Sequence, residues 1–303
     1  MIFLGISLLI DTFHKKVIME NSMLNRKENI LHNKLSDIRT LVIGDSHFAA
    51  GFNTKHFGHQ SYNYATSGEN YQQNYYKLKS ILEIPNSIIT VILPYDFHST
   101  SSFRNNRITD HSYWGKHIPF LKEAISQKNS DLLVDFVKSK AFSYLGQSNN
   151  WKSWYDGHKV KTIKEGVENR TVNFASSNNK QQIANRYAKL QFKGAIVPNT
   201  FALAHLVKMI TLCKKHNKQP ILVRMPVSQN YINEVVQYQN LEQLEITNMI
   251  YRTTKFPEIP YFNFRDSVPS LKFYSDANHL NFEGSRQLSK RLLDAMLKAG
   301  IEL

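Results

Sequence analysis

Short apolar runs alternate with segments of helical periodicity along much of the chain. Three runs, at residues 41–43, 87–93 and 220–225, are nearly continuous in aliphatic residues. Such runs are typical of strands that are covered on both faces of a parallel sheet. Shorter runs at residues 61–65 and 259–264 predict two further strands. Because strand and helix patterns follow one another, the sequence predicts a doubly wound α/β fold.

Helical segments are predicted between and after these strands. One covers residues 231–253 and another covers residues 283–297. A further helix begins near Thr200, with Asn199 or Thr200 as its cap. The buried stripe of that helix is expected to consist of Phe201, Ala204, Val207 and Ile210.

Two parts of the chain depart from the α/β pattern. Residues 99–198 are rich in Ser, Asn, Lys and aromatic residues, and this segment is too long for an ordinary connection. We interpret it as an insertion beside the mouth of an active site, because loops gather at the carboxyl ends of the strands, where ligands bind in such folds. Residues 1–10 are apolar, but a membrane-spanning helix needs about 20 apolar residues. They are therefore either the end of a membrane anchor or an amphipathic or buried segment.

The predicted domains follow from these patterns. Residues 1–37 form an N-terminal apolar segment and a polar, charged stalk. Residues 38–303 form an α/β domain with an insertion over about residues 99–198.

The charge of the chain narrows the classes of partner. Its 303 residues include 38 basic and 24 acidic side chains, a formal charge of +14. This excess favours anionic glycans, phospholipid headgroups or nucleic acid as partners, although a basic solvated surface explains it equally well. The sequence contains no nucleic-acid motif and no zinc-ligand spacing, so we predict no nucleic acid, no metal and no cofactor. The one cysteine, Cys213, is expected to be a buried thiol.

Candidate chemistry lies directly after the first strand. The run Leu41-Val42-Ile43 turns sharply through Gly44-Asp45-Ser46-His47 and resumes with a helical pattern. A serine at such a turn exposes its hydroxyl and holds its backbone N–H near the positive end of a helix. It can act as a nucleophile with a built-in donor for the oxyanion. The alternative is a plain turn, in which Gly-Asp-Ser is common.

A second motif favours the catalytic interpretation. Asp276 and His279 lie three positions apart. A carboxylate at this spacing can hold an imidazole in one tautomer and stabilise its protonated form, and the imidazole can then take the serine proton. The two motifs together predict a triad of Ser46, His279 and Asp276.

At these motifs the sequence resembles the SGNH/GDSL hydrolase superfamily. Gly44-Asp45-Ser46 resembles its first block, Asn63-Tyr-Ala-Thr-Ser-Gly68 its second, and Asp276-Ala-Asn-His279 its fifth. The likeness covers roughly residues 38–98 and 199–300.

This resemblance implies a flavodoxin-like three-layer α/β/α sandwich with a mostly parallel sheet and a large insertion. It also implies that the backbone N–H groups of Ser46 and Gly68 bind the oxyanion. Some members of the superfamily modify envelope polysaccharides.

The third block departs from the family pattern, which supplies an asparagine as an oxyanion donor. Here the strand predicted at residues 87–93 runs into Pro94-Tyr-Asp-Phe-His98, without asparagine. Asn70, Tyr95 and His98 are the candidate substitute donors. His47, next to the nucleophile, is expected to be a polar residue at the rim of the site.

These observations predict a serine esterase or O-acetyltransferase that acts on a cell-envelope or extracellular polysaccharide. The expected partners are an acylated or other carbohydrate polymer, an acyl-donor membrane protein, and a membrane contacted through the N-terminus. The expected location is the cell envelope. Candidate aromatic residues for stacking on sugars are Trp114, Trp151, Trp154 and Tyr155, which alternatively pack the insertion's own core. The alternative function is a degenerate domain that binds polysaccharide or scaffolds the machinery that modifies it.

Overall fold

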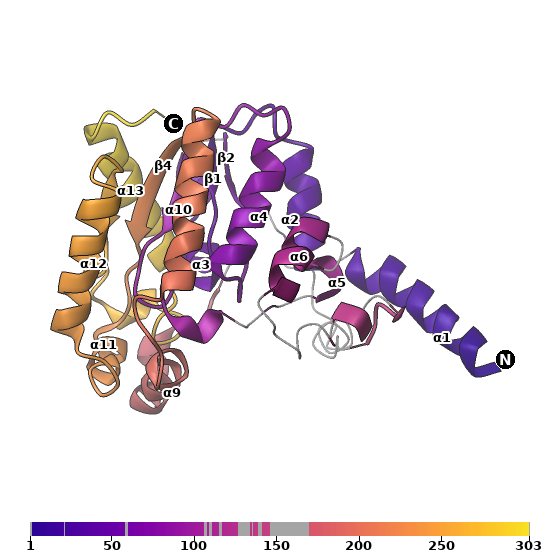
Figure 1. Cartoon of the computed structure of the whole chain (residues 1–303). Coiled ribbons are helices and arrows are strands. Elements are labelled where there is room, and N and C mark those ends of the chain that lie inside the picture. Colours follow the sequence, from indigo (N-terminus) through magenta and orange to yellow (C-terminus); the bar gives the residue numbers. More distant parts are fainter. Residues whose placement is uncertain are drawn as a thin grey trace. The chain divides into compact units, whose positions relative to one another are not determined.

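The computed structural model describes residues 2–20, 22–57, 60–105, 108, 111–114, 117–126, 134, 136–138, 141–145 and 170–302. The chain divides into two compact units (Figure 1). One consists of residues 1–33 and 108–163, and the other of residues 34–107 and 164–303. The division of the chain that the sequence predicts, at residue 37 and around residues 99–198, stays a prediction.

The second unit is built on a five-stranded parallel sheet. Its strand order is β2-β1-β3-β4-β5, and every pair of neighbouring strands runs parallel. This is the flavodoxin-like order, in which the direction of winding reverses beside β1. The predicted α/β fold with a mostly parallel sheet is therefore confirmed. The strands are β1 (Thr40–Val42), β2 (Ser61–Asn63), β3 (Thr90–Pro94), β4 (Gln219–Arg224) and β5 (Tyr261–Asn263).

Helices cover both faces of this sheet. Helix α4 packs against α10 on one face, and α3 packs against α13 on the other. The helices of this unit are α3 (Ser46–Gly51), α4 (Tyr71–Leu82), α9 (Lys180–Phe192), α10 (Thr200–Lys215), α11 (Gln229–Val235), α12 (Leu241–Lys255) and α13 (Phe282–Lys298). Short 3₁₀ turns lie at Thr54–Phe57, Ser102–Arg104, Phe174–Ser176 and Leu271–Phe273. The central strands are fully buried, as their continuous apolar runs predict.

Three helical features differ from the sequence prediction. The helix predicted over residues 231–253 is two helices, α11 and α12, with Asn240 as the N-cap of the second. Helix α10 leaves Ala204 and Val207 exposed, because apolar residues occur all around it and packing selects another stripe. Helix α9 lies within the predicted insertion, and its small residues Ala184 and Ala188 pack into the buried core of the sheet.

The first unit contains α1 (Ile2–Phe13), a π-helical turn (His14–Met19), α2 (Met23–His32), α5 (His111–Trp114) and α6 (Ile118–Ser126). Helix α1 carries exposed apolar side chains on several sides, including Phe3, which is 87% exposed. Among the residues that the structure describes, no helix is both long enough and apolar enough to cross a membrane. Membrane association through the N-terminus stays a prediction.

A buried ion pair in the second unit gives a test of the fold. The Lys77 ammonium lies 2.8 Å from a carboxylate oxygen of Glu69, and both side chains are fully buried. Lys77 also donates to the carbonyl oxygen of Tyr64 at 2.6 Å. We expect Lys77→Met to lower the free energy of unfolding by about 3–5 kcal/mol, because it leaves the Glu69 carboxylate buried without its cation. Urea unfolding measures this change.

The matched control is Lys79→Met on the same helix. Lys79 is partly exposed and lies 3.7 Å from Glu83, so its removal should cost less than about 1 kcal/mol. Equal losses in the two variants would contradict the assignment.

Candidate active site

The nucleophile turn connects β1 to α3. A Cβ atom on Gly44 would lie 2.7 Å from the Phe48 ring, so the turn has room only for glycine unless that ring moves. Asp45 is the N-cap of α3, and its Oδ1 accepts a hydrogen bond from the His47 N–H at 2.9 Å. Ser46 is therefore the first residue of the helix, with 9% of its surface exposed.

The Asp276–His279 segment is a closed loop that positions its own side chains. Tyr274 and Leu280 form an antiparallel bridge across its base. Within the loop, Asp276 Oδ1 accepts hydrogen bonds from the backbone N–H groups of Asn278 at 3.1 Å and His279 at 2.9 Å. The backbone turn therefore fixes the carboxylate beside the imidazole.

The structure brings the three predicted triad residues into contact. His279 Nε2 lies 2.9 Å from Ser46 Oγ. On the other side of the ring, Nδ1 lies 2.9 Å from Asp276 Oδ1 and 3.0 Å from Oδ2. Two segments that are 233 residues apart in the sequence thus meet at the carboxyl ends of the strands. Their geometry is that of a serine, a base and a carboxylate that orients the base.

Burial controls the protonation of this group. Burial lowers the pKa of His279 below its usual value, and the Asp276 carboxylate only partly opposes this. Burial would raise the pKa of Asp276, but His279 and the backbone N–H donors lower it overall. At neutral pH the imidazole is therefore neutral and the carboxylate ionised, the states that a general base and its partner need.

The turn that contains Gly68 runs alongside the nucleophile turn. The Thr66 N–H donates to the carbonyl oxygen of Gly44 at 3.1 Å. Gly68 has a φ of 90°, a left-handed conformation that favours glycine. The next residue, Glu69, forms the buried ion pair with Lys77. The role of the Gly68 N–H as an oxyanion donor stays a prediction.

The three side chains predicted as substitute donors each bond to another group. The Asn70 side chain caps α4 and donates to the carbonyl oxygen of Arg104 at 3.1 Å. The Tyr95 hydroxyl donates to the carbonyl oxygen of Asn248 at 2.9 Å. His98 uses both ring nitrogens on carboxylates, as described next.

His98 lies between two buried carboxylates and was not recognised in this role from the sequence. Its Nε2 lies 2.7 Å from Asp45 Oδ2, and its Nδ1 lies 2.5 Å from Asp96 Oδ1. The hydroxyl of Ser99 and the guanidinium of Arg104 also approach Asp45 Oδ2, at 3.2 and 3.6 Å. Burial alone would lower the pKa of His98, but the two carboxylates raise it to about 9. The signal in the sequence was the pair of ionisable residues in Asp96-Phe-His98, directly after a buried strand.

His47 is buried, so its predicted place at the rim is wrong. Its ring stacks on His98, with 3.6 Å between the ring centroids, and meets His279 edge-on at 4.7 Å. Burial, together with the cations nearby, holds the pKa of His47 well below its usual range, so this ring is neutral. The turn after β1 places His47 inward, against the segment that follows β3.

Side-chain atoms of His47, Asp96 and His98 lie within 4.8 Å of one another, close enough to be considered as metal ligands. The arrangement does not fit an ion well. His98 commits both nitrogens to carboxylates. The rings of His47 and His98 are also stacked in nearly parallel planes. The lone pair of each ring nitrogen lies in the plane of its ring, so the two rings cannot direct their lone pairs at one metal ion.

Of the aromatic residues predicted to contact sugars, Trp151, Trp154 and Tyr155 lie outside the described residues. Trp114 is fully buried, so it packs in the interior and is not available to a sugar.

No protein-family model and no curated protein matches the sequence. Among solved structures, the chain is similar to a protein described provisionally as a platelet activating factor from Streptococcus pneumonia. The identity is 13% and the TM-score 0.46, with 97% of this chain and 98% of the other covered.

It is also similar to a GDSL-like lipase from Bacteroides thetaiotaomicron (10% identity, TM-score 0.43, 92% and 100% covered). A third structure is described provisionally as an acylhydrolase from Bacteroides fragilis (11% identity, TM-score 0.42, 95% and 97% covered). At these identities and TM-scores, the likeness assigns no activity to this chain.

The ion pairs of His98 predict a pH-dependent stability. The folded-state pKa of about 9 lies above the usual value of 6.5 for a histidine, so the folded protein holds this proton more tightly than the unfolded chain does. The stabilisation is complete below about pH 6.5 and is lost as the pH rises through about 9. We expect His98→Gln to cost about 3–5 kcal/mol at pH 6, and less as the pH rises to 10.

Urea unfolding of the wild type and His98→Gln at several pH values measures this difference. A cost that stays constant from pH 6 to pH 10 would show that His98 is not a cation in the folded protein.

Proposed function

We propose that the protein is a serine-dependent esterase or O-acyltransferase. The observation that carries the proposal is the continuous set of contacts from Ser46 Oγ through the His279 ring to Asp276, at 2.9 Å on each side of the ring. Ser46 is the nucleophile, His279 the general base, and Asp276 the carboxylate that orients it.

In this mechanism Ser46 Oγ attacks the carbonyl carbon of an ester while its proton passes to His279 Nε2. The backbone N–H groups of Ser46 and Gly68 stabilise the oxyanion that forms. His279 then gives its proton to the departing alcohol, which leaves an acyl group on Ser46. Water or a sugar hydroxyl then attacks this acyl group while its proton passes to His279. The bond between the acyl carbon and Ser46 Oγ breaks, His279 returns the proton to Oγ, and the product leaves. The first acceptor makes the protein a hydrolase and the second makes it a transferase.

A polysaccharide of the cell envelope is the proposed substrate or acceptor. The proposal is supported by the formal charge of +14, which attracts acidic polymers. A membrane protein that supplies the acyl group is the proposed partner for the transferase.

A non-catalytic domain that binds polysaccharide is the alternative. It is favoured by one observation, which is that Asn70, Tyr95 and His98 all bond to other groups. A missing oxyanion donor raises the barrier by about 3 kcal/mol, which slows a reaction but does not abolish it. The contact between Ser46 and His279 favours the enzyme.

The nucleophile is tested by intact-mass measurement after brief exposure to p-nitrophenyl acetate. We expect one acetyl group on the wild type and none on Ser46→Ala. His279→Ala should lower the rate of nitrophenol release at least about a thousandfold, because the serine then lacks its base.

Ser101→Ala is the matched control, since Ser101 is another buried serine of this unit and bonds to the carbonyl oxygen of Gln191. Absence of an adduct and of nitrophenol release in the wild type would favour the non-catalytic alternative.

The acceptor is tested with a panel of acetylated and unacetylated glycans, both acidic and neutral. We expect acetate release from acetylated glycans, or acetyl transfer onto unacetylated ones, and both should be absent in Ser46→Ala. Mass spectrometry of the glycans measures both reactions. Reaction with small free esters alone would contradict a polysaccharide substrate.

A further inference from the structure

A cavity of about 330 Å³ lies near the carboxyl ends of β3, β4 and β5. Side chains of α12 form one of its walls. Its volume lies at the lower end of the range of about 300–1,000 Å³ that is usual for small-molecule sites. Neither Ser46 nor His279 lines it. It is therefore a different site from the triad, on the same edge of the sheet.

One guanidinium in this cavity, that of Arg252, is held in position by an aromatic ring. Arg252 lies over the ring of Tyr261, 4.7 Å from its centroid. In the described part of the chain, no carboxylate pairs with Arg252. The other arginine of the cavity, Arg224, is committed to Glu245 at 2.6 Å. Arg252 is thus the cation that is available to an anionic group.

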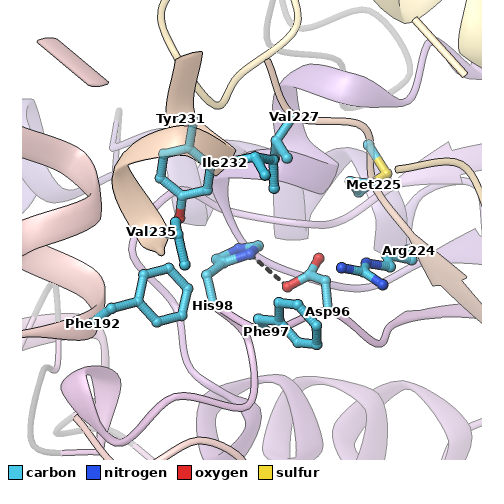
Figure 2. A pocket seen from close by; sticks show the side chains of 10 residues that line it. All are labelled: Asp96, Phe97, His98, Phe192, Arg224, Met225, Val227, Tyr231, Ile232 and Val235. Carbon is cyan, nitrogen blue, oxygen red and sulfur yellow. Dashed lines mark ion pairs between the residues drawn. The ribbon is translucent and has the colours of Figure 1, made fainter. Parts of the chain in front are cut away.

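The floor of the cavity is formed in part by a buried carboxylate. Asp96 lines the cavity, and its Oδ1 pairs with His98 at 2.5 Å, so its charge is balanced within the protein. Figure 2 shows Asp96 and Arg224, which line both this cavity and a smaller neighbouring pocket. The second oxygen of Asp96, Oδ2, is enclosed by the protein and does not reach the cavity.

Part of the rim of the cavity is apolar. Ile246 and Met249, on one face of α12, are 41% and 55% exposed. Glu245, on the same helix, also lines the cavity, and its side chain is 36% exposed. The cavity therefore combines a cation, a carboxylate that can accept from a hydroxyl, and an apolar wall. A hexose with a carboxylate offers the matching groups, which are one negative charge, several hydroxyl donors and an apolar C–H face. A phosphate fits less well, because its second negative charge would lie near Asp96 and Glu245.

We propose that this cavity binds a sugar unit that carries a carboxylate, with Arg252 on the carboxylate and the partly exposed Glu245 accepting a sugar hydroxyl. The choice of a sugar rests on the proposed function. The cavity is joined to the nucleophile turn by two contacts, from Asp96 to His98 and from His98 to Asp45.

Binding is measured with the full chain carrying Ser46→Ala, so that the result does not depend on catalysis. The probes are methyl β-D-glucuronoside and its neutral analogue methyl β-D-glucoside, titrated by calorimetry. We expect the acidic sugar to bind at least about tenfold more tightly than the neutral one, since a charge-assisted hydrogen bond contributes this much. Arg252→Gln should remove that preference, and Arg252→Lys should retain part of it.

The matched control is Lys255→Gln, which removes a positive charge from an exposed position of the same helix and does not line the cavity. It should leave both affinities unchanged if Arg252 acts locally. The proposal is overturned if the two sugars bind equally, if neither binds, or if Lys255→Gln weakens binding as much as Arg252→Gln.

Circular dichroism of Arg252→Gln shows whether the variant is folded, and so whether weaker binding reflects the lost contact. If the variant is misfolded, the comparison of the two sugars on the parent protein decides the question. Failure of the proposed enzyme would look different. The acidic sugar would still bind, but no acetyl group would appear on Ser46.

Discussion

The carboxylate of Asp45 lies in the interior, 2% exposed, directly before Ser46. This carboxylate has a structural role, because it caps α3 and so fixes the start of the helix that carries the nucleophile. It cannot remain unpaired, since an ionised carboxylate without partners costs several kcal/mol in a protein interior. The chain meets this requirement with one segment, the residues after β3. His98 and Arg104 bring positive charge from that segment, and Ser99 adds a hydroxyl donor.

The path of this segment then determines its other contacts. Arg104, at one end, donates to the backbone oxygen of Glu69 at 3.0 Å and so ties down the turn that contains Gly68. Asp96, at the other end, pairs with His98 and lines the cavity beside α12. The residues that neutralise the Asp45 carboxylate thus contact the nucleophile turn, the Gly68 turn and the cavity beside α12.

The sequence predicts the features of this protein that depend on nearby residues. The β1 strand, the turn at Ser46 and the three-residue spacing of Asp276 and His279 all reflect local chemistry, and the structure brings those side chains together. Contacts between distant segments could not be derived in this way. The pairing of His98 with Asp45 joins residues 53 positions apart, and nothing in either local pattern specifies it.

The wrong predictions have the same cause, which is that local sequence does not specify contacts between distant segments. His47 is polar and next to an active serine, which suggests a rim position, but packing against the segment after β3 buries it. Helix α9 has a weak apolar stripe made of alanines, which becomes visible as a core element only when the sheet that it covers is known. The cavity beside α12 depends on side chains from the segment after β3 and from β4, β5 and α12 at once, and no single stretch of sequence contains its pattern.

The charges of the cluster also limit what it contributes to the proposed reaction. Asp45 and Asp96 are paired with His98 and Arg104, so the group is close to neutral and its field falls off within a short distance. It therefore holds Ser46 in position but does not replace a hydrogen-bond donor on the oxyanion. In the proposed mechanism, stabilisation of the oxyanion falls to the N–H groups of Ser46 and Gly68 and to the imidazolium that forms at His279. The alignment of the Gly68 turn then matters as much as the triad. That turn is fixed by the buried pair of Glu69 and Lys77 on one side and by Arg104 on the other.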